Sequence, residues 1–459
     1  MFPTPTNVLD QIFQGIDPIQ IFLNAYTFCA TKEEAAFDLF RDDGFDTSYQ
    51  EKAKELETML KAGTPLPKLR QQLGGNDERE TLAHILGLVS ALARNINETQ
   101  QTKLTKSIEP YYNSRGYPYW LGLNRPPLGG RIPNLRRRPS ELHWKFVDCH
   151  EPLSVAPGRL KEGEWKLTRI KLDESLEYFL RRRLENGGFR IAASPLSYQA
   201  DIQGKSRHRP QHTPPYAFHL TSIEPVQEQI ATLNAVLESA RNEGVSLLVL
   251  PELRMQPELL EAAKIFLRKQ IIDEKCGLLV VVAGSWHIEE EKRRVNRSVV
   301  LNHRGEELWA HDKLREYVIT AANFDENPDF YRPLGIEEGG GEEDIHRGTK
   351  LEFYDSSIGR LAVAICVGFF SSDIEDLLRS SAANVFLVPA MSPSTSEMEL
   401  VAKDLTRTQT AVTFVAACGY IGTVAAKSSK ALCFYQLPAK GLGPEKLKDN
   451  GKLLFYTLP

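Results

Sequence analysis

After Gly188, short apolar runs alternate with longer amphipathic stretches, and this alternation limits the folds open to the chain. Apolar residues are nearly continuous in "VSLLVLPE" and "GLLVVVAGSWH", as in strands that are buried on both faces. Residues 225–244 and 262–276 instead place apolar side chains three or four positions apart, as helices do. Strands alternating with helices predict an α/β or α+β domain built from layered sheets.

The N-terminal part has a different pattern. Residues 1 to about 105 are expected to be helical, because stretches such as "RETLAHILGLVSALARNI" repeat apolar residues at helical spacing. A further helix, "LDESLEYFLRRRLENGG", ends in two glycines and indicates a domain boundary. We therefore expect a mainly helical N-terminal domain over residues 1–185, which includes an Arg- and aromatic-rich segment at 111–140, and a second domain over 186–459.

Composition excludes several classes of protein. The 56 basic and 60 acidic residues give a net charge of −4, which offers no general reason to bind nucleic acid or membranes. The N-terminus lacks the basic region of a secretory signal. The six cysteines are scattered without a CxxC pair, which favours a reducing, cytoplasmic location without a disulfide framework or a metal site. His208 and His212 have no further ligands at metal spacing.

Three chemically active residues stand at or just after the ends of expected strands. Glu252 follows "LLVLP", Lys313 lies in "LWAHDKL", and Cys366 ends "LAVAI". A cysteine attacks a carbonyl or nitrile carbon as a thiolate, so it needs a base and a nearby positive charge. Glu252 can supply the base, while the Lys313 ammonium and the backbone N–H of Val367 can stabilise the oxyanion.

In these contexts the residues resemble the carbon–nitrogen hydrolase, or nitrilase, superfamily. "LLVLPEL", "NRSVVLNHRGEELWAHDKL" and "GRLAVAIC" are similar to its glutamate, lysine and cysteine segments, over about residues 188–425. The resemblance implies a four-layer α-β-β-α sandwich, a Glu252–Lys313–Cys366 triad, no cofactor, and a homodimer or larger homo-oligomer. It also implies a second glutamate between the lysine and the cysteine. "NFDENPDFY" is similar to that segment, so Glu326 is the candidate and Glu316 the alternative.

The cysteine segment departs from the family pattern. An aromatic residue and then an acid usually follow the cysteine, whereas Val367 and Gly368 stand here, and an acid comes only at Asp373. A lone cysteine at a strand end is otherwise most often a small buried apolar residue. Two segments are expected to be loops: the Gly- and acid-rich run 336–344, solvated and flexible, and the insertion 205–215.

We therefore predict a hydrolase that cleaves a non-peptide carbon–nitrogen bond of a small amide, carbamoyl or nitrile compound through a thioester on Cys366. The alternative is a non-catalytic or partner-dependent module whose N-terminal half binds nucleic acid or another protein. Arginines can pair with phosphates, and aromatic rings can stack on bases. The candidate contacts for this alternative share the basic segment: Arg131, Arg136, Arg137 and Arg138.

Overall fold

The computed structural model describes most of the chain. The described residues are 5–14, 17–32, 35, 45–73, 77–107, 109–115, 117–123, 153–157, 159–160, 165–196, 201–270, 272, 277–291, 293–326, 328–392, 394–409, 411–418, 433–437, 445–446 and 453–457. The chain divides into two compact units, Met1–Arg125 with Ile132–Gly163, and Pro126–Arg131 with Glu164–Pro459. Within the described ranges, no helix combines the length and the apolar character that crossing a bilayer requires.

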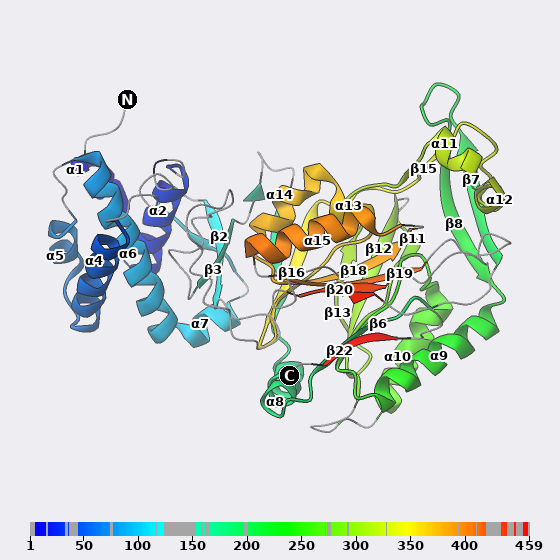
Figure 1. Ribbon diagram of the computed structural model, residues 1–459, viewed down its shortest axis with the longest axis horizontal. Helices are drawn as coiled ribbons and strands as arrows, with labels where there is room; N and C mark the ends of the chain where they lie inside the picture. Colours follow the sequence, from blue (N-terminus) through cyan, green and yellow to red (C-terminus); the bar gives the residue numbers. More distant parts are fainter. Residues whose placement is uncertain are drawn as a thin grey trace. The chain divides into compact units, whose positions relative to one another are not determined.

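The first unit is mainly helical, as expected from the sequence (Figure 1). Its helices are α1 (Pro5–Ile12), α2 (Pro18–Ala30), α4 (Phe45–Lys61), α5 (Leu66–Gln71), α6 (Glu78–Thr99) and α7 (Gln101–Lys106). Asp17 and Asp77 begin α2 and α6 by accepting backbone N–H groups of the first turn. The apolar faces of α2, α4 and α6 share one core. The short strands are β1 (Tyr111–Tyr112), β2 (Pro118–Leu123), β3 (Leu153–Pro157) and β4 (Arg159–Leu160).

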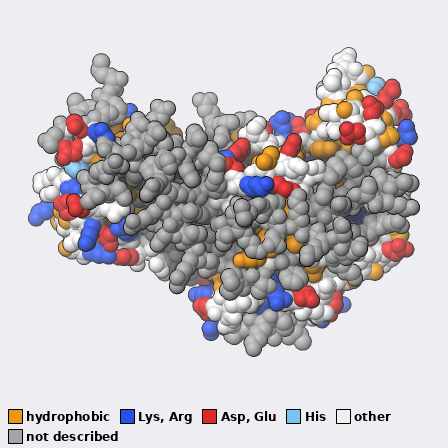
Figure 2. Space-filling model, viewed as in Figure 1, with side chains coloured by type: hydrophobic (Ala, Val, Ile, Leu, Met, Phe, Trp, Pro, Cys, Tyr) orange, Lys and Arg blue, Asp and Glu red, His pale blue; other side chains and the backbone are white. Residues whose placement is uncertain are grey.

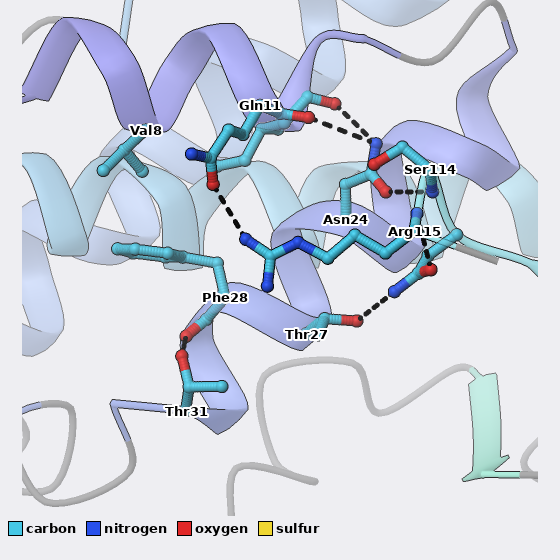
Figure 3. A pocket seen from close by; sticks show the side chains of 10 residues that line it. Val8, Gln11, Asn24, Thr27, Phe28, Thr31, Ser114 and Arg115 are labelled. Atoms are coloured by element: carbon cyan, nitrogen blue, oxygen red, sulfur yellow. Dashed lines mark hydrogen bonds between the residues drawn. The ribbon is translucent and has the colours of Figure 1, made fainter. Parts of the chain in front are cut away.

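A small hollow in the first unit lies between α1, α2 and the turn after β1 (Figure 3). Its polar groups bond to one another: Nδ2 of Asn24 donates to the carbonyl of Ile12, and Oδ1 accepts the N–H of Ser114. Arg115 donates to Oε1 of Gln11 at 3.0 Å. These bonds fasten the turn to the helices, so we assign the hollow a structural role.

Two sheets form the centre of the second unit. One has the order β11-β12-β10-β9-β6-β22, with β13 beside β12, and the strands of the other that fall in this unit run β21-β20-β19-β18-β17-β16-β5. The strands of the first sheet are β6 (Arg190–Ala193), β9 (Leu247–Val249), β10 (Val280–Val282), β11 (Trp286–Glu290), β12 (Arg293–Asn302), β13 (Glu307–Asp312) and β22 (Leu454–Thr457). Those of the second are β5 (Trp165–Arg169), β16 (Lys350–Ser356), β17 (Gly359–Val363), β18 (Val385–Met391), β19 (Val412–Cys418), β20 (Phe434–Gln436) and β21 (Glu445–Lys446).

The two sheets pack face to face and helices cover their outer sides (Figure 1). Strands β18 and β19 lie against β9, and Trp309 of β13 stacks on Tyr354 of β16 with ring centres 5.8 Å apart. Helices α9 (Val226–Asn242) and α10 (Pro257–Lys269) share a core with the first sheet. Helices α13 (Val367–Phe370), α14 (Ser372–Ser380) and α15 (Ser396–Gln409) lie beside the second, where Phe369 contacts Phe386. The expected α-β-β-α layering is therefore confirmed.

A third, smaller sheet has the order β14-β15-β8-β7. Its strands are β7 (Asp201–His208), β8 (Tyr216–Glu224), β14 (Val318–Ile319) and β15 (Gly341–Glu343), and beside it lie α11 (Ala321–Glu326), α12 (Pro328–Tyr331) and the 3-10 helix η3 (Arg332–Leu334). Acidic and basic side chains are interspersed on its surface (Figure 2), as in the pairs Arg209–Glu342 and Arg207–Asp344.

The small sheet corrects two expectations. Residues 205–208, expected in an insertion loop, belong to β7, and the expected solvated loop 336–344 contains β15. The reason is pairing with a strand distant in sequence, which the local residue pattern does not predict. Strand β7 pairs antiparallel with β8, and β15 pairs parallel with β8, with Gly341 opposite Tyr216.

The unit boundary falls at Gly163, whereas the sequence predicted a boundary near residue 185. Residues after 163 join the second unit because β5 pairs parallel with β16. Helix α8 (Glu174–Glu185) follows β5, and its buried Arg183 donates to Ser246 Oγ and the Gly277 carbonyl. The α8 cap residue Asp173 also accepts hydrogen bonds from Asn302 and Arg304. These contacts fix α8 to the first sheet of the second unit.

Candidate active site

Glu252 lies in a tight turn just after β9, and contacts with Gly284 and Ser285 hold this turn in place. Leu253 has a φ of 54°, and its N–H donates to Ser285 Oγ at 3.2 Å. Gly284 has a φ of 52°, and a Cβ on it would lie 2.1 Å from the Pro251 carbonyl oxygen, so only glycine fits there. The Glu252 carboxylate is 2% exposed. The end of β9 thus holds this carboxylate in one buried place.

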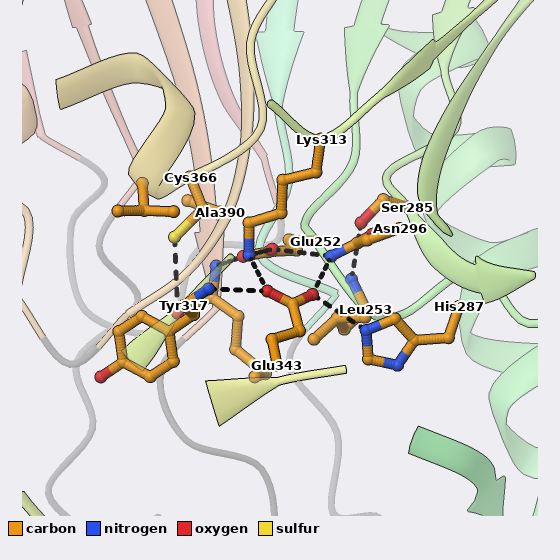
Figure 4. A network of polar contacts seen from close by, with 12 residues as sticks. Glu252, Leu253, Ser285, His287, Asn296, Lys313, Tyr317, Glu343, Cys366 and Ala390 are labelled. Carbon is orange, nitrogen blue, oxygen red and sulfur yellow. Dashed lines mark hydrogen bonds and ion pairs between the residues drawn. The ribbon is translucent and has the colours of Figure 1, made fainter. Parts of the chain in front are cut away.

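Lys313 comes from the end of β13 and reaches both carboxylates of the site (Figure 4). Its Nζ lies 2.7 Å from Oε1 of Glu252 and 2.6 Å from Oε2 of Glu343. The backbone of Lys313 is also fixed, since its N–H donates to the Asn296 carbonyl at 2.8 Å. The side chain is 1% exposed, so this ion-paired group is removed from water.

Further donors point at the two carboxylates. Nδ2 of Asn296 bridges them, 3.0 Å from Oε1 of Glu252 and 2.8 Å from Oε1 of Glu343. The Met391 N–H donates to Oε2 of Glu252, and the Tyr317 N–H donates to Oε2 of Glu343, both at 3.0 Å. Every carboxylate oxygen therefore has a partner, as buried ionised groups require.

Cys366 follows β17 at a sharp bend into α13 (Figure 4). Its φ of 44° and ψ of −113° are unusual for a residue with a side chain, and such strain is concentrated at functional sites. Its N–H donates to the Pro389 carbonyl at 2.9 Å, and Sγ lies 3.9 Å from the Met391 carbonyl oxygen. Met391 also binds Glu252 through its N–H, so one residue of β18 contacts both the thiol and the carboxylate.

Electrostatics favour a neutral thiol beside a charged network. Burial and the Glu252 carboxylate raise the pKa of Cys366 well above its usual value, although Lys313 acts in the opposite direction. Burial alone would lower the pKa of Lys313, but Glu252 and Glu343 outweigh it and hold that pKa above normal. Burial alone would raise the pKa of Glu343, but the charge of Lys313 and the hydrogen bond with His287 outweigh it and keep that pKa well below its ordinary range. At rest, the site thus holds a thiol near an ammonium and two carboxylates.

The structure brings together three of the residues named from the sequence: Glu252, Lys313 and Cys366. It does not bring Glu326 to them, because Glu326 is an exposed residue at the end of α11. Glu316 pairs with Arg347 instead. The second carboxylate on Lys313 is Glu343, which corrects the assignment of Glu326.

Glu343, Asn296 and His287 were not identified from the sequence. Glu343 stands in the Gly- and acid-rich run, where an acid next to β15 has no distinguishing pattern. Asn296 and His287 are also buried, but each stands in a strand that contains charged residues as well, β12 (RRVNRSVVLN) and β11 (WHIEE), so no apolar pattern marked them. Their positions in β12 and β11 place them beside each other, in the pair His287↔Asn296.

One remaining candidate adjoins Cys366, and the others lie outside the described residues. Val367 is the half-buried first residue of α13, directly after Cys366. Arg131, Arg136, Arg137 and Arg138 fall within 124–152, which the structure does not describe, so their proposed contacts stay a prediction. Among the described residues, no group of three or more His, Cys, Asp or Glu side chains is placed to hold a metal ion.

Comparisons with known proteins found no matching family model and no matching curated protein. Among solved structures, Nit3 of Saccharomyces cerevisiae, described as a member of branch 10 of the nitrilase superfamily, matches at 14% identity over 59% of this chain and 89% of its own, with a TM-score of 0.40. An amidase from Nesterenkonia sp. matches at 17% identity over 59% of this chain and 90% of its own, with a TM-score of 0.38. The glutamine-dependent NAD+ synthetase from Acinetobacter baumannii matches at 12% identity over 58% of this chain and 45% of its own, with a TM-score of 0.39. Because these identities and TM-scores are low, the function has to be inferred from the residues of the site itself.

Proposed function

We propose that the protein is a hydrolase that cleaves a carbon–nitrogen bond of a small amide, carbamoyl compound or nitrile through a covalent thioester on Cys366. One observation carries the proposal: the strained, buried Cys366 shares a water-poor site with the Glu252 carboxylate and the Lys313 ammonium. A structural cysteine needs neither partner, whereas a nucleophilic cysteine needs a base and a positive charge.

For an amide, Glu252 takes the proton of the Cys366 thiol as Sγ attacks the carbonyl carbon. Proton transfer inside the site conserves its total charge, which matters because an added thiolate next to two carboxylates would be costly in low dielectric. The new S–C bond turns the carbonyl oxygen into an oxyanion. The Lys313 ammonium stabilises that charge, and the Val367 N–H, one residue after the nucleophile, is proposed as the second donor.

The tetrahedral intermediate collapses as the proton on Glu252 passes to the leaving nitrogen, and the C–N bond breaks. Ammonia or an amine departs and a thioester remains on Cys366. Glu252 then accepts a proton from a water molecule that attacks the thioester carbon, and the returned proton restores the thiol as the acid leaves. For a nitrile, the first adduct is a thioimidate, and two water additions release the acid and ammonia.

Glu343 keeps Lys313 charged and in place during these steps. Its Oε2 is 2.6 Å from Nζ of Lys313, and its Oε1 accepts from Asn296, which also donates to Glu252. We infer that Glu343 orients the network and that Glu252 does the proton transfer, because the Met391 backbone joins Glu252 to the thiol.

The test is release of ammonia or carboxylic acid from a panel of small primary amides, carbamoyl compounds and nitriles. The wild type should turn over at least one class, and Cys366→Ala should abolish turnover while preserving the thermal unfolding midpoint. Cys418→Ala is the matched control, because Cys418 is an equally buried thiol whose Sγ lies 3.8 Å from the Glu252 carbonyl oxygen. Hydrolysis by Cys366→Ala at the wild-type rate would refute the proposal.

A further inference from the structure

We propose that His287 is a positioning residue, which holds the Glu343 carboxylate against Lys313 and so joins the small sheet to the catalytic cluster. This inference rests on the proposed function, because Glu343 matters only if Lys313 and Cys366 act on a substrate. His287 comes from β11 of the first large sheet, whereas Glu343 comes from β15 of the small sheet.

Both ring nitrogens of His287 are bonded within the protein, and Figure 4 shows the contact with Glu343. Nδ1 accepts the backbone N–H of Leu220 at 2.8 Å, and Nε2 lies 2.9 Å from Oε1 of Glu343. A nitrogen that accepts a backbone N–H carries no proton, so the proton of the neutral ring is on Nε2 and is donated to Glu343. The His287 side chain is 1% exposed, so water does not replace either bond.

This arrangement fixes which ring nitrogen donates. Because Nδ1 accepts the Leu220 N–H, the hydrogen bond that the ring can donate comes from Nε2, which faces Glu343. A neutral donor stabilises the Glu343 carboxylate without adding a second positive charge to compete with Lys313. Glu343 therefore keeps Oε2 on the ammonium and Oε1 on uncharged donors, His287 and Asn296.

The hydrogen bond between His287 and Glu343 also helps to hold β15, which is a short strand. β15 has three residues, and Glu343 is the last of them. Leu220 lies on β8, the strand that pairs with β15, so His287 contacts both strands from outside their sheet. Because His287 contacts Glu343, and Glu343 contacts Lys313, we infer that His287 acts on the site through these two residues.

The experiment separates the two bonds of the ring. His287→Asn places an amide oxygen where Nδ1 stands and keeps the Leu220 bond, but it is too short to reach Glu343. His287→Gln places an amide N–H near Nε2 and keeps a donor for Glu343. The readout is the rate constant for alkylation of Cys366 by 2-chloroacetamide, in which Sγ displaces chloride and forms a thioether, followed by intact-mass spectrometry. Thermal unfolding midpoints are measured in parallel.

We expect His287→Asn to lower the rate constant by about tenfold or more, the change that corresponds to one lost hydrogen bond to a charged group. His287→Gln should recover most of the rate even if both variants have the same unfolding midpoint. In a Glu343→Gln background, His287→Asn should cause little further loss, because the effect passes through Glu343.

The outcomes distinguish this inference from the proposed function. If wild-type Cys366 reacts no faster than Cys418, the proposed function fails. If wild-type Cys366 reacts fast and His287→Asn matches it, only the positioning role fails. Equal losses in the Asn and Gln variants, tracking a common fall in the unfolding midpoint, would also overturn the positioning role and leave His287 as a packing residue.

Discussion

Nζ of Lys313 lies 2.6 Å from Oε2 of Glu343, although the two residues are 30 positions apart and come from different sheets. The contact makes the small sheet part of the site, because β15 supplies the second of the two carboxylates that neutralise the ammonium. Apolar residues of the small sheet share a core with Leu253 and Trp286, against which Met391 packs, and excluding water beside the cluster strengthens the charge interactions inside it.

Replacing Lys313 by methionine should cost stability as well as activity. Glu252 and Glu343 would then face each other without their shared ammonium, and breaking a buried ion pair costs about 3–5 kcal/mol. Urea unfolding measures this loss. Arg268→Met is the control, because Arg268 and Glu261 are each 54% exposed and such pairs contribute about 0–1 kcal/mol.

The double variant Lys313→Met with Glu343→Gln should regain part of that stability, since it removes one of the two opposed charges. Neither variant should alkylate at the wild-type rate. A Lys313→Met protein as stable as the wild type would contradict the buried, charged network described here.

Gly284→Ala should disturb Glu252 without touching it. The added methyl group would meet the Pro251 carbonyl oxygen, 2.1 Å from the ideal Cβ position, at a φ that disfavours alanine. We expect a loss of more than about 1 kcal/mol in the free energy of unfolding and a lower activity. Gly187→Ala is matched, since Gly187 has a φ of 64° but nothing lies within 4 Å of its added Cβ. Equal effects of the two substitutions would show that the close approach to Pro251 is unimportant.

The Cys366 thiol should be protonated at neutral pH. Burial, and then Glu252, raise its pKa, so the thiolate should appear only above the ordinary thiol value of about 8.5. The raised pKa makes a stabilising contribution to the free energy of unfolding at pH values below the ordinary thiol pKa. This contribution is lost as pH rises from the ordinary pKa toward the folded-state pKa of Cys366. Thiolate absorbance near 240 nm, as the difference between wild type and Cys366→Ala, measures the titration. A step below about pH 7 would contradict the charge assignment.

Local patterns predicted the large sheets and the positions of Glu252, Lys313 and Cys366, because Glu252 and Cys366 come shortly after the apolar runs of β9 and β17, and Lys313 directly follows β13. Periodicity is strongest in such buried strands and in the helices that cover them. The same alternation predicted a layered α/β or α+β domain, which the structure confirms in α9, β9, α10 and β10, whereas the four-layer α-β-β-α order was implied by the resemblance to carbon–nitrogen hydrolases.

Glu343 could not be found this way. Its strand has three residues in a run of glycines and acids, and what buries it is pairing with β8, more than 100 positions earlier. The boundary at Gly163 was missed for a similar reason, since β5 joins the second unit through β16, far along the chain. Local composition carries no information on such pairing, and the burial of His287 and Asn296, in strands that also carry charged residues, becomes visible only in the structure.

The most direct test of the central claim is the relative reactivity of two buried thiols in the folded protein. Limited 2-chloroacetamide is added at neutral pH to the wild type, Glu252→Gln and Lys313→Met, and peptide mapping gives the fraction of Cys366 and of Cys418 that is modified. If Glu252 takes the proton and Lys313 stabilises the developing charge, Cys366 should react at least about tenfold faster than Cys418 in the wild type, and each variant should remove most of that difference. Equal reactivity of Cys366 and Cys418 in the wild type would contradict the account and leave Cys366 as a buried structural residue.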